Sequence, residues 1–143
     1  MTDLDVAKNR LYDESLTLVI VKHGKAVYET RSHRISGILE AIDTRGEEVR
    51  DSSMADRVVG KAVALLCVYA KVKWVYAVVL SRQAQAVFEK HKIPYQSEEF
   101  VDNVLDSNRA GVCPFERVAA DLIDPEDAYE AFKRLHQNLK QCK

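Results

Sequence analysis

The sequence contains few of the residues that bend or cross-link a chain. Its 143 residues include 3 prolines, 5 glycines and 3 cysteines, with no internal repeat or low-complexity tract. The number of cysteines is odd, and the three residues, Cys67, Cys113 and Cys142, are widely spaced along the sequence. This cysteine usage argues against a disulfide framework and indicates a reducing compartment.

The sequence also lacks a charge excess and a long apolar run. A formal net charge of -1 gives nucleic acid or an anionic membrane no overall attraction to the protein. The longest apolar run, Ala62 to Ala70, is far shorter than the roughly 20 residues of a membrane-spanning helix. The polar, mixed-charge start MTDLDVAKNR is not a secretory signal. We therefore expect a cytoplasmic protein without nucleic-acid or membrane partners.

What is present is typical of a soluble globular chain, with 47% hydrophobic and 30% charged residues. The length indicates one domain over residues 1–143, including an N-terminal helix and a C-terminal helical extension from about residue 124. Residues Leu4, Ala7 and Leu11 predict the N-terminal helix, and His23-Gly24 predicts the turn of a hairpin between strands 15–22 and 25–30.

The remaining elements follow from periodicity and from turn residues. In chain order they are a helix through Ile35 and Ile42, a loop over 45–52, a helix from Met54 to about Lys71, a strand over Trp74–Leu80, a helix capped by Ser81, a strand over Pro94–Glu98, a short helix near Phe100–Leu105, and helices from Pro114 and Pro125. Strands that alternate with helices pair in parallel, whereas a hairpin is antiparallel. The sequence therefore predicts an α/β fold, a three-layer α/β/α sandwich with a mixed sheet.

Two short motifs place an acidic residue near an expected helix start. Ser53-Met54-Ala55-Asp56 and Cys113-Pro114-Phe115-Glu116 both fit the capping box, in which a side chain at the third helical position bonds back to the cap. Asp124-Pro125-Glu126-Asp127 has the same layout without any sign of chemistry. Asp56 and Glu116 are thus candidate catalytic residues whose alternative role is helix capping.

Cys113 is the third candidate catalytic residue. Cysteine is a poor helix cap, and a thiol at a helix N-terminus can have its pKa lowered. The alternative for Cys113 is a small buried hydrophobic residue, the role we expect for Cys67. We predict that Cys113 is the most reactive of the three thiols.

Gly60 and Lys61 are candidate ligand-binding residues. A glycine within the expected helix, four residues after Asp56, indicates close approach of a ligand or of a neighbouring backbone. Lys61 and Arg57, also four apart, offer positive charge on an adjacent face, either for an anion or simply for solvent.

Together "DRVVGKA" and "CPFE" resemble an uncharacterised prokaryotic family with the cytidine-deaminase-like fold. True deaminases of that fold carry H-x-E and P-C-x-x-C, each opening a helix around a catalytic zinc. The resemblance places Asp56 at the histidine and Cys113 and Glu116 at the two cysteines. It also places Val58 where the proton-shuttling glutamate belongs, and valine cannot transfer a proton. We therefore expect no ordinary cytidine deamination.

Metal and cofactor signals are weak. Two carboxylates and one thiolate are an unusual catalytic zinc set, and the four histidines, His23, His33, His91 and His136, lie in turns, in loops or near helix ends. We expect no metal and no cofactor.

The favoured function is the binding of a small anionic or nucleotide-like molecule, with or without catalysis, between the helix starts at Ser53 and Cys113. One alternative is a non-catalytic interaction or structural module. Another is an atypical enzyme with Cys113 as nucleophile and Asp56 or Glu116 as its acid–base partner. The sequence is compatible with a homo-oligomer and does not determine the oligomeric state.

Overall fold

The computed structural model describes residues 1–32, 35–102 and 114–141. Its helices are α1 (Asp3–Asp13), α2 (Ser36–Val49), α3 (Lys61–Ala70), α4 (Arg82–Lys90), α5 (Pro114–Ala119) and α6 (Pro125–Gln141). Its strands are β1 (Leu18–Lys22), β2 (Lys25–Thr30), β3 (Ser53–Val59), β4 (Trp74–Ser81) and β5 (Tyr95–Val101).

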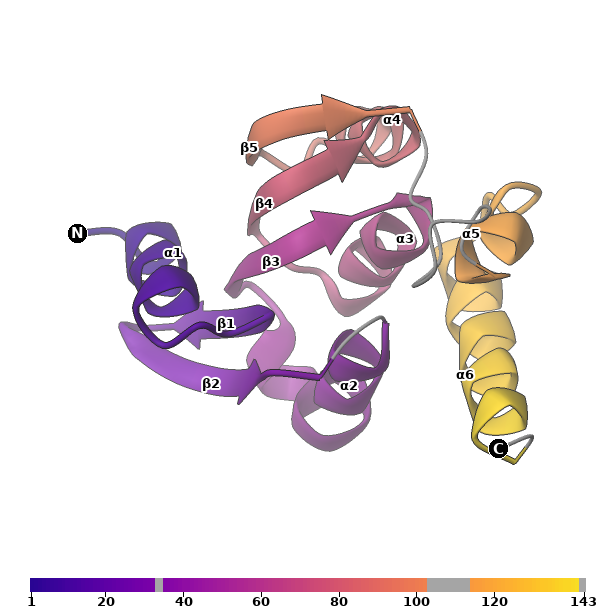
Figure 1. Cartoon of the computed structure of the whole chain (residues 1–143), viewed down its shortest axis with the longest axis horizontal. Helices are drawn as coiled ribbons and strands as arrows, with labels where there is room; N and C mark the ends of the chain where they lie inside the picture. Colours follow the sequence, from indigo (N-terminus) through magenta and orange to yellow (C-terminus); the bar gives the residue numbers. More distant parts are fainter. Residues whose placement is uncertain (33–34, 103–113, 142–143) are drawn as a thin grey trace.

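The strands form one mixed sheet in the order β2-β1-β3-β4-β5 (Figure 1). Strand β1 runs antiparallel to both of its neighbours, whereas β3, β4 and β5 are mutually parallel. This arrangement confirms the predicted α/β class, the antiparallel hairpin and the parallel second half. The β-branched residues of β1 and β4 fill the central positions, where apolar residues face helices on both sides.

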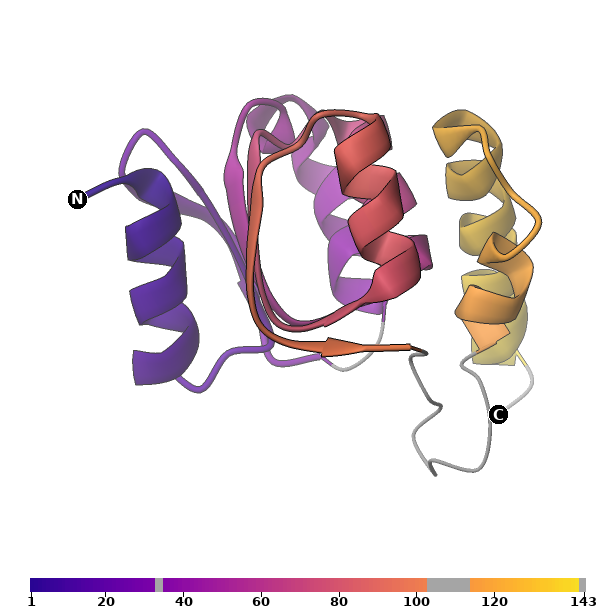
Figure 2. The same cartoon turned by 90° about the horizontal axis from the view of Figure 1, so that it is seen from above.

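Helices cover both faces of the sheet. Helix α1 covers one face, where Leu4, Ala7 and Leu11 pack against buried residues of the sheet (Figure 2). Helices α2, α3 and α4 cover the opposite face, and α5 and α6 lie outside them, against α3 (Figure 2). Phe115 of α5 and Phe132 of α6 join the same core cluster as α3. The predicted C-terminal extension is thus a further layer of helix.

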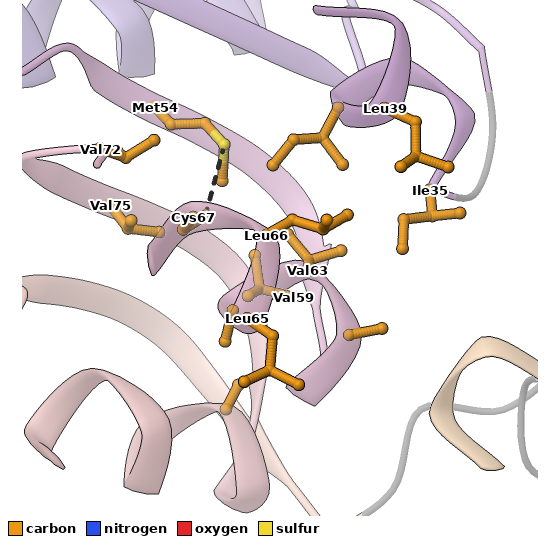
Figure 3. Close-up of a cluster of buried hydrophobic side chains, with 14 of the residues drawn as sticks. Ile35, Leu39, Met54, Val59, Val63, Leu65, Leu66, Cys67, Val72 and Val75 are labelled. Carbon is orange, nitrogen blue, oxygen red and sulfur yellow. Dashed lines mark hydrogen bonds between the residues drawn. The ribbon is translucent and has the colours of Figure 1, made fainter. Parts of the chain in front are cut away.

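The core between the sheet and α3 is strongly apolar. Cys67 lies there, fully buried, with its Sγ atom 3.8 Å from Sδ of Met54 (Figure 3). Leu39 of α2 and Ile35, the N-cap residue of that helix, belong to the same cluster (Figure 3). The prediction that Cys67 is a core residue is confirmed.

One predicted helix is wrong. Residues Met54 to Lys71 do not form a single helix, because Ser53–Val59 is strand β3 and α3 begins only at Lys61. Met54, Ala55 and Arg57 have good helix propensity, but pairing with β1 on one side and β4 on the other outweighs it. Gly60, with extended backbone, is the N-cap of α3 and separates the two elements.

Two smaller predictions are also wrong. The loop expected over 45–52 is mostly helix, since α2 continues to the buried Val49 across a non-helical turn at Arg45. Phe100, expected in a short helix, lies in β5. The rest of that helix, together with His33, Cys113 and Cys142, lies largely or wholly outside the described residues.

Candidate functional site

Asp56 lies at the middle of β3, with Leu18 of β1 on one side and Ala77 of β4 on the other. Side chains alternate along a strand, so Asp56 points to the same face as Met54, two residues earlier. Met54 contacts Cys67 of α3. Asp56 is therefore a half-buried carboxyl group beneath α3, on the face of the sheet that α2, α3 and α4 cover.

This position changes the acidity of Asp56. Burial raises its pKa to about 7, although the backbone N–H groups of Val58 and Arg57 oppose the shift. The contact with Val58 is long, at 3.4 Å to Oδ1 of Asp56. Burial, with a smaller effect from the Asp56 charge, also raises the pKa of the Cys67 thiol. A carboxyl group that titrates near neutral pH can both accept and donate a proton under physiological conditions.

Helix α2 begins close to β1, the strand next to β3. A Cβ atom at Gly37 would lie 3.2 Å from Cδ2 of Leu18, the residue that pairs with Asp56. Sequence reasoning missed Gly37, although a glycine inside the expected 35–42 helix was a signal of such close approach. Neither of the N-cap residues, Ile35 before α2 and Gly60 before α3, supplies a side-chain cap, so both helix starts depend on other groups for their N–H partners.

Glu116 supplies that partner for α3. Its two carboxylate oxygens lie 3.3 and 3.4 Å from the backbone nitrogen of Ala62. Burial raises the pKa of Glu116, while the N–H groups of Ala62 and Lys61 and the Lys61 charge act in the opposite direction. Glu116 therefore caps the start of α3 from its position on α5, a role that its local four-residue motif did not predict. The capping box predicted with Cys113 involves a residue outside the described part of the chain.

Lys61 makes a second link between these helices. Its Nζ donates to the carbonyl oxygen of Ala120, at the end of α5, over 3.1 Å. Arg57 is on the opposite face of the sheet. There its guanidinium donates to the carbonyl oxygens of Leu16 and Leu11, at 2.9 Å each. The shared helical face predicted for Arg57 and Lys61 does not exist, because Arg57 belongs to β3.

The candidate residues thus surround α3 without meeting at one point. Asp56 lies beneath the helix, Gly60 and Lys61 begin it, and Glu116 binds its first turn. None of the described contacts joins the two carboxylates. Asp56 does not open a helix, so its predicted capping box is wrong and its comparison with the H-x-E motif fails at that point. Pro114 does begin α5, as predicted.

Within the described ranges, no group of three or more histidine, cysteine, aspartate or glutamate side chains is arranged to hold a metal ion. In the same part of the chain, no helix combines the length and the apolar character needed to cross a bilayer.

Comparison with known proteins identifies the family. The family model of the domain of unknown function DUF1893 matches residues 6–135. The chain belongs to the DUF1893 family. A DUF1893 family protein from Thermotoga maritima has a similar solved structure, with a TM-score of 0.84 and 20% sequence identity over 94% of this chain and 90% of that one.

No curated protein matches this DUF1893 chain. The predicted membership in an uncharacterised family is confirmed. At 20% identity the Thermotoga maritima protein supports the fold of the DUF1893 domain and carries no information about a reaction.

Proposed function

We propose that this DUF1893 protein binds a small nucleotide-like or anionic molecule on the helix-covered face of β3, close to the starts of α2 and α3. The observation that carries the proposal is Asp56, a half-buried carboxyl group whose pKa is about 7. Charged groups are seldom placed on the inner face of a sheet without a function, and groups with perturbed pKa values concentrate at functional sites.

The surroundings of Asp56 support a ligand of mixed polarity. Ligands of open α/β sheets bind outside the carboxyl ends of the parallel strands, and Asp56 is three residues before β3 ends. Helix starts favour anionic or carbonyl oxygens, while a carboxyl group near its pKa can pair with either a donor or an acceptor. Nucleosides, nucleotides and their bases carry both kinds of group.

A catalytic role would use Asp56 as general acid or base. Cys113 stays the proposed nucleophile of such an enzyme, and its greater reactivity stays a prediction. A cytoplasmic location agrees with the use of a free thiol.

A second candidate function is a non-catalytic module, and a specific observation favours it. Glu116 and Lys61 are both engaged in attaching α5 to the start of α3. Two of the residues that suggested chemistry therefore have a structural use.

The two functions are separated by thermal-shift measurements with a panel of nucleosides, nucleotides and free bases. We expect at least one compound to raise the Tm of the wild type, and Asp56→Ala to remove the shift. Asp13→Ala, which removes an exposed carboxyl at the end of α1, is the matched control and should retain the shift. A shift that survives in Asp56→Ala places the ligand elsewhere, and a panel without any shift supports the non-catalytic module.

A further inference from the structure

An open groove of about 280 Å³ lies on the other side of α3, away from α2. Its walls are α3, α4 and the connection between α5 and α6. The lining residues are Lys61, Leu65, Gln83, Ala86, Val87, Lys90, His91, Leu122 and Ile123. The volume is close to the lower end of the roughly 300 to 1,000 Å³ of small-molecule sites.

The floor and one rim of the groove are apolar. Leu65 and Val87 are buried beneath it, whereas the side chain of Ile123 is 72% exposed at its edge. A side chain as large as isoleucine gains free energy when such exposure is covered. The groove therefore suits a ligand with an apolar body.

The polar groups around the groove indicate which chemical group the ligand should carry at its other end. Among the described lining residues, Lys61, Lys90 and His91 can carry positive charge, and none is acidic. Lys61 is held in place by its bond to the Ala120 carbonyl oxygen, which uses one of three ammonium donors. A carboxylate complements this set of groups.

We propose that the groove binds small amphipathic monocarboxylates, with the chain on Leu65, Val87 and Ile123 and the carboxylate at Lys90 and His91, at the end of α4. The site is separate from the one that contains Asp56. Because the groove is shallow and open, we expect binding in roughly the millimolar range.

The test is a titration of the isotope-labelled full chain with sodium octanoate, followed by amide chemical shifts. We expect saturable shifts concentrated in α4 and residues 120–124, and weaker binding by both 1-octanol, which lacks the charge, and acetate, which lacks the chain. Uniform or non-saturating shifts, or equal binding of octanol and octanoate, would overturn the proposal.

Two variants locate the site. Ala86→Phe fills the groove from an exposed position of α4 and should abolish saturable binding. Lys90→Ala should weaken octanoate binding about two- to fivefold, as expected for an exposed ion pair, and needs no repacking. Lys73→Ala, an exposed lysine that does not line the groove, is the matched control and should leave binding unchanged.

Retained wild-type affinity in Ala86→Phe and Lys90→Ala contradicts the proposal. Amide resonances of the groove that shift with protein concentration in the absence of octanoate would also contradict the proposal, because a second copy of the chain would then occupy the groove. Asp56→Ala should bind octanoate normally, so the outcome at this groove is independent of the outcome at the Asp56 site.

Discussion

Glu116 illustrates how a single side chain can serve two elements. It lies in the first turn of α5, yet its oxygens accept from the backbone of α3. The first N–H groups of a helix have no partner inside the helix, so removing this acceptor leaves a partly buried donor unsatisfied.

We predict that Glu116→Ala lowers the free energy of unfolding by about 1 to 2 kcal/mol, and that Glu116→Gln costs about half as much because it keeps an oxygen acceptor. Urea unfolding measures both values, and amide hydrogen exchange at Ala62 should accelerate. Glu126→Ala, at an exposed position in the first turn of α6, is the control, with an expected cost below about 0.5 kcal/mol. Equal losses for Glu116→Ala and Glu126→Ala would contradict the interhelical cap.

The sequence identified Glu116 as a capping acid but could not show which helix it caps. A capping box is a local pattern, whereas the bond from Glu116 to Ala62 joins residues 54 positions apart. Asp56 was likewise identified as a residue of interest on the assumption of a helix, and its near-neutral pKa arises from burial beneath α3. Burial of this kind depends on tertiary structure and is invisible in a four-residue motif.

At the scale of elements, helix α2 contains two glycines with opposite roles. A Cβ atom at Gly37 would lie 2.9 Å from Cγ2 of Thr30 and 3.2 Å from Cδ2 of Leu18, whereas at Gly46 it would meet nothing within 4 Å. Gly37 thus allows α2 to approach the hairpin, and Gly46 only weakens the helix.

We predict that Gly37→Ala lowers the free energy of unfolding by about 1 to 3 kcal/mol through overpacking against β1 and β2. Gly46→Ala should raise it by about 0.5 to 1 kcal/mol through helix propensity. Denaturant unfolding of the two variants checks the opposite signs. If both substitutions stabilise the protein, the close approach of α2 to the sheet is wrong.

Strand β3 shows why one element was missed. Its first five residues, Ser53 to Arg57, include no β-branched residue, and only Gly60 and Lys61 separate the apolar end of β3 from the apolar run of α3. Only Val58-Val59 followed by Gly60 marks the change from strand to helix. A buried central strand and a buried helix cannot be distinguished by periodicity alone.

At the scale of the whole molecule, the predicted class, the antiparallel hairpin and the parallel second half of the sheet were correct because long, strongly patterned segments determine them, although strand β3 was missed from the order of elements. The docking of α6 was not predictable. It depends on side chains that meet only in the folded protein: Tyr129 stacks on Tyr69 of α3 at a centroid distance of 4.4 Å and donates to Asp43 of α2. Lys133 reaches the same Asp43 carboxylate at 3.7 Å.

The burial of Asp56 also makes the stability of the whole protein depend on pH. In the unfolded chain an aspartate titrates near its ordinary pKa of 3.8, whereas in the folded protein the pKa is about 7. Between these values the folded state holds a proton that the unfolded state has released, so stability must fall as pH rises through this window. The full penalty applies above about pH 7, and none applies below about pH 4.

The measurement that tests this account most directly is the free energy of unfolding of the wild type and of Asp56→Asn from pH 4 to pH 8.5. We predict that the free energy of unfolding of Asp56→Asn, relative to that of the wild type, rises by about 2 to 4 kcal/mol from pH 4 to pH 8, because asparagine cannot ionise. Asp51→Asn, an exposed turn position, should show no such trend. A difference between wild type and Asp56→Asn that stays constant over this range would mean that Asp56 ionises like a solvent-exposed carboxylate, and would contradict the proposed site.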